Sequence, residues 1–360
     1  MNLHYFITLA AGPRHRAIML LNMPDALCVL LAAALDRRIE LLRRLHAEDT
    51  DAYRLFHGTA EGQAGLTVDR YGDLLLVQSF HSLLSPSQLA VLEAFYAQAL
   101  PGLTLVYNDR SRPNSRIANT LSPERLAAAM APRQARELGV AYRIQGRHAG
   151  QDPWLFLDLR VARRRVLREA AGKSLLNVFA YTCGVGVAAA KAGASSVVNV
   201  DFSQSSLAVG EENARLNDLP IQLRFVQSDA FAAMRQFSGL GQSQVVRGRR
   251  LPPFLKLEQQ RFDLVFLDPP RYAQSPFGVV DLVCDYPAVF KPALLCVAEG
   301  GALICCNNAA QAAREVWLEQ LERSARKAGH PIRSVEWLAP ESDFPSPDGR
   351  PPMKMVLLRL

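Results

Sequence analysis

The chain has 360 residues, of which 49% are hydrophobic and 21% charged, and it carries a formal net charge of +7. This length and balance predict a soluble globular protein of two or three domains with a substantial buried core. The longest apolar run, Ala26 to Leu35, has ten residues, whereas a membrane-spanning helix needs about 20. We therefore expect no membrane-spanning segment.

The amino-terminal segment and the cysteines bear on the cellular compartment. Residues 1–24 contain Arg14 and Arg16 but no acid, and they lack the continuous apolar core and cleavage site of a secretory signal. We interpret residues 1–22 as an extension, or as the product of an upstream start with Met23 as the first native residue. The six cysteines show no Cys-x-x-Cys spacing with partner histidines, which predicts neither a metal site nor a disulfide framework. A cytoplasmic protein without a bound metal is expected.

Three regions separate along the chain. Residues 1–50 are an amino-terminal helical extension with one helix over 24–48, residues 51–150 a small α+β module, and residues 151–360 an α/β domain. In the small module, strand patterns lie at Leu66–Val68, Leu74–Phe80 and Leu103–Tyr107, and a helix pattern around Ser87–Ala99.

The carboxy-terminal region alternates between short apolar strands and helices. The strand patterns are Leu175–Ala180, Ser196–Asp201, Leu223–Gln227, Phe262–Leu267 and Ala302–Cys306. The helix patterns are Val185–Ala192, Ser203–Asn217, Ala230–Phe237 and Gln311–Lys327, and a basic insert occupies 238–260. This alternation predicts a Rossmann-like, doubly wound α/β domain with a mostly parallel sheet. Ligands of such sheets bind at the carboxyl ends of the strands.

Small and acidic residues follow the predicted strands at that edge. Tyr181 to Gly186 form a small-residue loop in which Gly184 and Gly186 allow a close approach of the backbone to a ligand. Asp201 is placed to accept hydrogen bonds from ribose hydroxyls, and Asp229 to meet an adenine amino group. Gly184, Gly186 and Ala189 also fit the dinucleotide fingerprint, so a nicotinamide-dependent dehydrogenase is an alternative.

The fourth strand of the pattern favours a different chemistry. Asp268-Pro269-Pro270 is a stiff turn in which two prolines remove backbone donors and leave carbonyls free to accept. Such a turn presents carboxylate and carbonyl acceptors to a planar, amine-bearing substrate beside a cofactor. A rigid turn that merely ends a buried strand is the simpler explanation, but the acids after two other strands favour a site.

Several motifs resemble those of a known family, the class I methyltransferases of the large-subunit ribosomal RNA type, which make 5-methylcytosine or 7-methylguanine. In the α/β domain these motifs are Asn177-Val-Phe-Ala-Tyr-Thr-Cys-Gly184, Val200-Asp-Phe-Ser-Gln204, Glu212-Asn-Ala-Arg-Leu-Asn217 and Phe262-Asp-Leu-Val-Phe-Leu-Asp-Pro-Pro270. Upstream they are Gly65-Leu-Thr-Val-Asp-Arg-Tyr-Gly-Asp73, Asn108-Asp-Arg-Ser111 and Phe156-Leu-Asp-Leu-Arg160. The resemblance covers roughly residues 53–360.

The resemblance implies S-adenosylmethionine (SAM) as cofactor and a base of 23S ribosomal RNA as substrate. By analogy with the family, Phe156, Asp158 and Arg160 help to hold the cofactor, and Phe179 and Tyr181 lie beside its methionine part. We also expect Asp268 and the backbone carbonyls of Pro269 and Pro270 to orient the substrate base.

The chain departs from the 5-methylcytosine relatives in two respects. Those relatives carry an amino-terminal RNA-binding domain, and the segment before residue 53 is too short and too helical to be one. They also carry a nucleophilic cysteine at the position that, counted from Gly300-Gly301, is Asn308 here. The pair Asn307-Asn308 resembles the 7-methylguanine relatives.

Guanine nitrogen 7 has its own lone pair and needs no covalent help, whereas carbon 5 of cytosine requires a thiolate to add first. We therefore expect direct methyl displacement, with the amides of Asn307 and Asn308 reading a base edge. Cys306 as a nucleophile is the alternative, and it requires the loop to shift by two residues.

The charge distribution is consistent with an RNA partner. Between Asp109 and Glu169 there are thirteen arginines against six acids and no lysine, a net charge of +7 for this stretch alone. The planar guanidinium fork matches phosphate oxygens, although a solvated charged surface is the alternative. Methylation of a protein or a small molecule, and a non-catalytic RNA-binding role, are competing functions. The sequence makes no prediction of oligomeric state or of the role of the insert.

Overall fold

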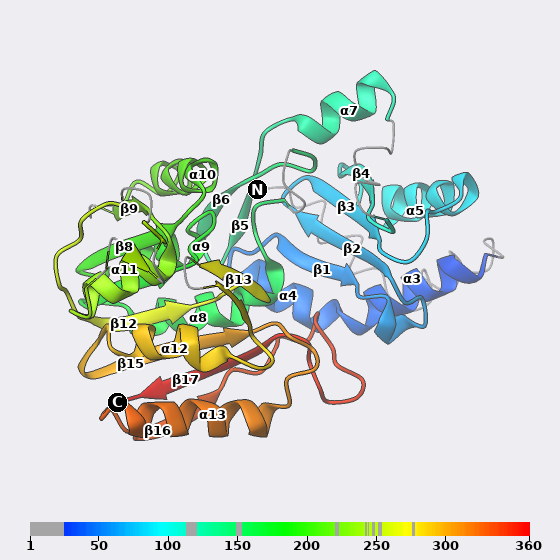
Figure 1. The fold of residues 1–360 in the computed structure, drawn as a ribbon. Helices are drawn as coiled ribbons and strands as arrows, with labels where there is room; N and C mark the ends of the chain where they lie inside the picture. Colours follow the sequence, from blue (N-terminus) through cyan, green and yellow to red (C-terminus); the bar gives the residue numbers. More distant parts are fainter. Residues whose placement is uncertain are drawn as a thin grey trace. The chain divides into compact units, whose positions relative to one another are not determined.

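The structure is a computed structural model that describes residues 25–112, 121–148, 153–219, 223–241, 243, 245–246, 249–250, 254–275 and 278–360. It divides into two compact units (Figure 1). The first comprises the described residues up to Leu157 together with Glu341–Pro347, and the second comprises Asp158–Pro340 and Asp348–Leu360. Within the described residues, no helix combines the length and apolar character needed to cross a bilayer.

The first unit is built on a four-stranded sheet of order β1-β2-β3-β4. Strands β1, β2 and β3 are antiparallel neighbours, whereas β3 and β4 are parallel. The strands are β1 (Ala52–Phe56), β2 (Leu66–Tyr71), β3 (Leu74–Ser79) and β4 (Thr104–Asp109), and a separate hairpin pairs β5 (Arg133–Glu137) with β6 (Val140–Ile144). The helices are α3 (Ala26–Arg37), α4 (Ile39–Ala47), α5 (Pro86–Ala99) and α7 (Pro123–Met130), with a 3₁₀ turn η1 (Thr59–Glu61).

The segment predicted as one helix over 24–48 is two helices, α3 and α4, which meet at Arg38. The Arg38 side chain is buried, where it pairs with Glu61 at 2.8 Å and donates to the Ala34 carbonyl at 3.0 Å. Leu31, Leu42 and other apolar residues of both helices pack into one core with the sheet. The prediction of helix is correct for most of this range, but a single helix is wrong, because the chain breaks at Arg38, whose ion-pair partner Glu61 lies outside the segment.

The second unit is built on a seven-stranded sheet of order β16-β17-β15-β12-β7-β8-β9. Five neighbouring strands of this sheet, β15, β12, β7, β8 and β9, are parallel to one another. Strand β17 pairs antiparallel with both β15 and β16. The strands are β7 (Ser174–Val178), β8 (Ser196–Asp201), β9 (Leu223–Gln227), β12 (Phe262–Leu267), β15 (Val297–Asn307), β16 (Ser334–Trp337) and β17 (Lys354–Arg359). The predicted doubly wound α/β domain with a mostly parallel sheet is confirmed.

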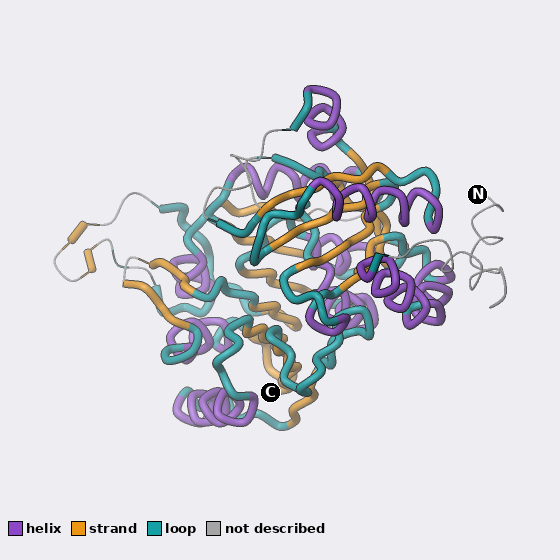
Figure 2. The backbone as a smooth tube through the Cα atoms, turned by 90° about the vertical axis from the view of Figure 1, so that its right-hand side faces the viewer, coloured by secondary structure: helices purple, strands orange, loops and turns teal. Residues whose placement is uncertain are grey.

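Helices cover both faces of this sheet. They are α8 (Arg160–Glu169), α9 (Gly184–Lys191), α10 (Gln204–Arg215), α11 (Ala230–Phe237), α12 (Tyr286–Leu294) and α13 (Arg314–Lys327). One core packs α8 and α9 against the sheet, and the other packs α11, α12 and α13 against the opposite face. Neighbouring strand residues alternate between them: Ile304 and Cys306 lie in the first core, and Leu303 and Cys305 in the second. Figure 2 shows helices alongside the strands from a second direction.

Short elements complete the second unit. A hairpin of β13 (Tyr272–Ser275) and β14 (Gly278–Asp281) follows the Asp-Pro-Pro turn, the two-residue strands β10 (Val245–Val246) and β11 (Arg249–Arg250) pair in the insert, and a 3₁₀ turn η2 (Leu157–Leu159) precedes α8. Sequence pattern did not predict α8, α12, β16 or β17. Helix α8 carries five arginines in ten residues, so its apolar face reduces to a few positions such as Ala162 and Val166.

Candidate active site at the carboxyl edge of the sheet

The strand order of the second unit reverses between β7 and β12. From β7 the chain proceeds outward through β8 and β9, and from β12 it proceeds the other way to β15. Val178 and Leu267 are register partners at the ends of these two strands. The loop after β7 and the Asp-Pro-Pro turn therefore leave the sheet at the same edge, which is where open α/β sheets form their ligand crevice.

The loop after β7 adopts an unusual backbone. Phe179, Tyr181 and Cys183 all have positive φ, at 59°, 50° and 60°. Each non-glycine residue in this region costs of the order of 1–3 kcal/mol and persists only where its surroundings hold it. The holding contacts include a bond from the Tyr181 amide to Asp201 Oδ2 at 2.8 Å and one from Asn213 Nδ2 to the Thr182 carbonyl at 3.0 Å. The loop is thus fixed in a strained form, as ligand-binding loops often are.

Gly186 has a packing role that the fingerprint pattern does not indicate. A Cβ at this position would lie 2.0 Å from Oδ1 of Asn199, a buried residue of β8. Asn199 Oδ1 in turn accepts a bond of 2.9 Å from Asn177 Nδ2 of β7. The absence of a side chain at Gly186 therefore lets α9 approach this asparagine pair. Gly184 is the first residue of α9, directly after the loop, and is half-buried.

The two acids that follow β8 and β9 lie at the same edge and bond to nearby backbone. Asp201 accepts from the Tyr181 amide and, through Oδ1, from the Ser203 amide at 2.9 Å. Asp229 caps α11 by accepting from the Ala232 amide at 2.9 Å. Burial raises the pKa of both carboxyl groups, and the backbone donors partly oppose the rise. Each oxygen has a second lone pair with which it can accept from a ligand.

Asp268, the residue directly after β12, is the most perturbed acid of this edge. Burial, together with the nearby Asp158 carboxylate, raises the pKa of Asp268 to about 7. The nearby Cys306 thiol and Arg163 guanidinium oppose the rise. Pro269 is buried and Pro270 exposed, so the turn runs from the core toward solvent. A carboxyl whose pKa is shifted to near neutrality is typical of a functional group.

The end of β15 separates its two asparagines. Asn307 is fully buried, donates from Nδ2 to the Leu282 carbonyl at 3.3 Å and accepts at Oδ1 from the Ala309 amide at 2.9 Å. Asn308 is exposed. Of the two amides proposed to read a base edge, Asn307 instead secures the loop, and Asn308 is the accessible one.

The two cysteines at the end of β15 are buried in the core. Cys305 and Cys306 have no exposed surface, and burial raises the pKa of both thiols, that of Cys306 to well above its ordinary value. The Tyr286 hydroxyl donates to the Cys306 carbonyl at 2.8 Å and helps to fix this part of the strand. A thiolate is the reactive form of cysteine, so neither thiol is poised to attack a substrate.

The segment that the resemblance links to the cofactor contains side chains in contrasting environments. Phe156 is 45% exposed, whereas Arg160, the first residue of α8, has no exposed surface. Asp158 lies in η2, half-buried and close enough to raise the pKa of Asp268. The burial of Arg160 favours a supporting role for this side chain over direct contact with a ligand.

Three residues that bear on the site were not singled out from the sequence. Arg163, 2% exposed, faces the Asp268 carboxyl from α8, Tyr286 anchors β15 from α12, and Asn213 holds the β7 loop from α10. Asn213 stands inside a quoted motif, and Arg163 follows Arg160 at helical spacing. These were the available signals, but the sequence did not show that α8 is a helix with a buried arginine face.

Comparisons with known proteins agree with this architecture. Residues 54–359 match the S-adenosylmethionine-dependent methyltransferase family. The chain is 25% identical over 301 residues to ribosomal RNA large subunit methyltransferase I of Shigella flexneri, covering 82% of this chain and 70% of the relative. It is 26% identical over 301 residues to the protein of the same name from Escherichia coli O157:H7, with the same coverage.

Solved structures share the fold. A Streptococcus mutans protein assigned as a SAM-dependent methyltransferase superposes with a TM-score of 0.71 at 24% identity, over 92% of this chain and 80% of that one. A protein assigned as a methyltransferase and crystallised with S-adenosylhomocysteine superposes with a TM-score of 0.73 at 23% identity and the same coverage.

The sheet and its switch point define a Rossmann-like α/β fold, a class that binds ligands at the carboxyl edge of the sheet. The chain belongs to the S-adenosylmethionine-dependent methyltransferase family. The dehydrogenase alternative raised by Gly184, Gly186 and Ala189 is thereby excluded. The antiparallel strand β17 beside β15 also differs from the dinucleotide-binding order, in which the sheet continues outward as 3-2-1-4-5-6.

Proposed function

We propose that this enzyme methylates a base of large-subunit ribosomal RNA by direct displacement, without a covalent enzyme–base intermediate. The observation that carries the proposal is the pairing of an accessible amide and a near-neutral carboxyl, Asn308 and Asp268, with a buried and protonated thiol, Cys306. The names of the curated relatives support ribosomal RNA as the substrate. A substrate nitrogen with its own lone pair, such as guanine N7, is the nucleophile that suits a site without a thiolate.

The residues at the carboxyl edge fit SAM. The carboxylates of Asp201 and Asp229 end adjacent strands and suit ribose hydroxyls and an adenine amino group, respectively. We propose that Phe179, Tyr181 and Gly184 border the methionine part and that Gly186 acts through the packing of α9. Phe156, Asp158 and Arg160 complete the proposed set, the last as a support. When bound, SAM supplies a methyl group activated by a sulfonium charge.

The remaining residues act on the base. The Pro269 and Pro270 carbonyls and Asn308 orient its edge, so that its nucleophilic nitrogen points at the methyl group. Such positioning can supply roughly 7–11 kcal/mol of a barrier. As the base accepts a methyl cation it gains positive charge, and the Asp268 carboxylate stabilises that charge when it is ionised. The Asp268 pKa of about 7 places this ionisation within the physiological range.

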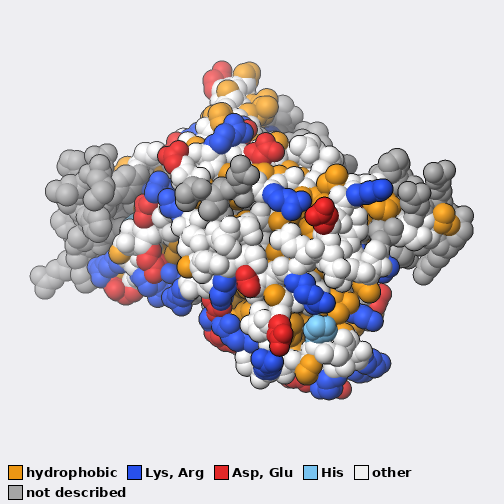
Figure 3. All heavy atoms as spheres, turned by 90° about the vertical axis from the view of Figure 1, so that its left-hand side faces the viewer, with side chains coloured by type: hydrophobic (Ala, Val, Ile, Leu, Met, Phe, Trp, Pro, Cys, Tyr) orange, Lys and Arg blue, Asp and Glu red, His pale blue; other side chains and the backbone are white. Residues whose placement is uncertain are grey.

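Arginines between Asp109 and Glu169 are proposed to hold the RNA backbone, although part of this set has structural roles. Arg160 and Arg163 are buried, and among the described residues four others form ion pairs with acids: Arg125 with Glu93, Arg133 with Asp73, Arg136 with Asp49 and Arg165 with Glu169. The set available to phosphates is therefore smaller than composition suggests. On the face seen in Figure 3, basic side chains are interspersed with acidic and apolar ones and form no single continuous patch. A ribosomal RNA substrate implies a cytoplasmic enzyme.

The decisive experiment is methyl transfer from labelled SAM to ribosomal RNA from cells that lack this gene, followed by nucleoside mass spectrometry. Label in a methylguanine is the expected result. Label in 5-methylcytosine would retain the enzyme class but refute the direct-displacement mechanism. No label in RNA, with SAM binding intact in a thermal-shift assay, would refute RNA as the substrate and leave a protein or a small molecule. Asp268→Ala should abolish transfer without loss of the fold.

A further inference from the structure

A cavity of about 460 Å³ opens in the second unit away from the proposed active site. Arg261 lines it just before β12 begins, whereas Asp268 follows the end of the same strand. At about 3.3 Å per residue, the six residues of β12 separate the two positions by roughly 20 Å. The volume lies within the usual range of small-ligand sites, roughly 300–1,000 Å³. This cavity therefore lies at the opposite end of β12 from Asp268.

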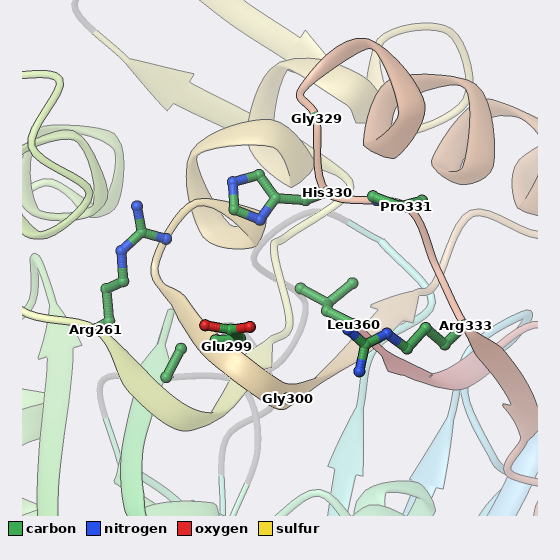
Figure 4. A pocket seen from close by; sticks show the side chains of 9 residues that line it. Arg261, Glu299, Gly300, Gly329, His330, Pro331, Arg333 and Leu360 are labelled. Carbon is green, nitrogen blue, oxygen red and sulfur yellow. The ribbon is translucent and has the colours of Figure 1, made fainter.

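Charged side chains of both signs converge on this cavity from different elements (Figure 4). Arg261 precedes β12, Glu299 belongs to β15, and His330 and Arg333 follow α13. Within the described part of the chain no ion pair joins Glu299 to these cations, and the Arg261 side chain donates only to the Val297 carbonyl, at 3.3 Å. These groups retain hydrogen-bonding capacity that a ligand could use.

The frame around the cavity is part of the sheet. The Leu360 amide donates to the Gly301 carbonyl at 3.1 Å, and the Arg333 amide donates to the Arg359 carbonyl at 2.8 Å. Gly300 turns the chain at a φ of 70°, and a Cβ there would meet nothing within 4 Å. The buried Leu360 side chain contributes an apolar floor beside the charged groups. The charged walls are thus anchored to fixed backbone around an open space.

We infer that this cavity binds a nucleotide unit, with Arg261, His330 and Arg333 directed at its phosphate and Glu299 at the N–H donors of its base. Guanidinium groups bind phosphate oxygens in a bidentate manner. A carboxylate accepts but does not donate, so it selects a base with adjacent N–H donors, and guanine presents such a pair. The apolar floor suits the base or ribose face. The inference rests on the proposed function to the extent that the nucleotide belongs to the RNA substrate.

The test is equilibrium binding by Arg261→Ala/Arg333→Ala, measured without SAM. One arm uses a short single-stranded RNA over a series of salt concentrations, and the other uses guanosine 5′-monophosphate. Arg326→Ala is the matched control, because it removes one exposed arginine of α13 that pairs with Glu322 at 3.9 Å and does not line the cavity. Each lost phosphate contact should weaken binding by about tenfold and lower the salt slope by about 1.

The outcomes distinguish the source of the nucleotide. Weaker RNA binding with a reduced salt slope, in the double variant but not in Arg326→Ala, assigns the cavity to a nucleotide of the substrate. Loss of guanosine monophosphate binding with unchanged RNA binding assigns it to a free nucleotide. Wild-type binding in both arms overturns the inference.

Base selection and catalysis provide separate readouts. Glu299→Gln should reduce the preference for guanosine over uridine monophosphate, since an amide no longer offers two acceptors. If the enzyme methylates ribosomal RNA and the double variant binds RNA and guanosine monophosphate as tightly as the wild type, only the nucleotide-binding role of this cavity is refuted. Nucleotide binding that depends on Arg261 and Arg333, in an enzyme that methylates no RNA, would refute only the proposed function.

Discussion

Replacement of Asp268 by asparagine should stabilise the protein above neutral pH while removing its activity. Burial and the Asp158 carboxylate raise the pKa of Asp268 from 3.8 to about 7. An acid with a raised folded pKa binds its proton more tightly in the folded state, so stability is lost as pH rises from about 4 to about 7. At about 1.4 kcal/mol per pKa unit, ionised Asp268 lowers the free energy of unfolding above pH 7 by at most about 4 kcal/mol. Partial solvent exposure of the carboxyl group makes the loss smaller.

The assay is urea unfolding of both proteins at pH 5 and pH 8. The stability advantage of Asp268→Asn should grow by up to about 3 kcal/mol between these values. Asp263→Asn, in the strand that ends just before Asp268, is the control: amide and hydroxyl donors of Ser174 lower the pKa of Asp263, so its contribution is constant over this interval. Asp158→Asn should shrink the pH-dependent difference. An equal advantage at both pH values would refute the argument that Asp268 titrates near neutrality.

The other predictions concern packing, the thiol and the amides. Gly186→Ala should cost about 1–3 kcal/mol in urea unfolding, because its Cβ would lie 2.0 Å from Asn199 Oδ1, and Asn199→Ala should relieve most of that cost; weakened SAM binding without destabilisation would show that the glycine serves the ligand instead. Cys306→Ser should retain methyl transfer, and its inactivation with an intact fold would restore the thiolate route. Asn308→Ala should lower kcat by about tenfold or more with SAM binding unchanged in a thermal-shift assay. Asn307→Ala should instead lower the urea midpoint, since it leaves buried backbone groups unpaired.

The parallel core of the second unit could be predicted from sequence because its strands are short apolar runs with clear ends. The expected bounds of β8, β9 and β12 coincide with those in the structure, as do those of α11. In each case a polar or acidic residue stands where the strand leaves the core. Strand β15 is longer than predicted, beginning at Val297, because Glu299 to Gly301 interrupt its apolar pattern without ending it.

The rest of the fold depends on partners distant in the chain. Strand β17 occupies the place beside β15 only through antiparallel pairing with residues about 50 positions earlier, such as Cys306 with Met355. Helix α8 exists because Ala162 and Val166 pack on the sheet, while its arginines obscure the pattern. Neither feature has a local signature.

For the candidate site, the sequence likewise predicted which positions lie at the edge of the sheet, whereas packing decided what each side chain does. Residue positions at the strand ends followed from the βαβ pattern, but burial sorted their roles. Asn307 and Asn308 are chemically identical neighbours, and only the structure distinguishes the buried loop anchor from the exposed amide. Period-two alternation along β15 explains this difference only in part, since the strand ends between them.

The burial of Asp268 beside Asp158 connects stability with function. A second carboxylate near a half-buried acid is unfavourable, and a fold selected for stability alone would not keep both. Arg163 and the Cys306 thiol oppose the repulsion without abolishing it, so that the pKa settles at about 7 rather than far higher. Because these contributions oppose one another, the Asp268 carboxyl is neutral in mild acid and ionised in mild base. If the Asp268 carboxylate stabilises the cation formed on the base, methyl transfer should fall with the fraction ionised below pH 7, and Asp158→Asn should move that fall to lower pH. A pH profile that Asp158→Asn leaves in place would separate Asp268 ionisation from catalysis.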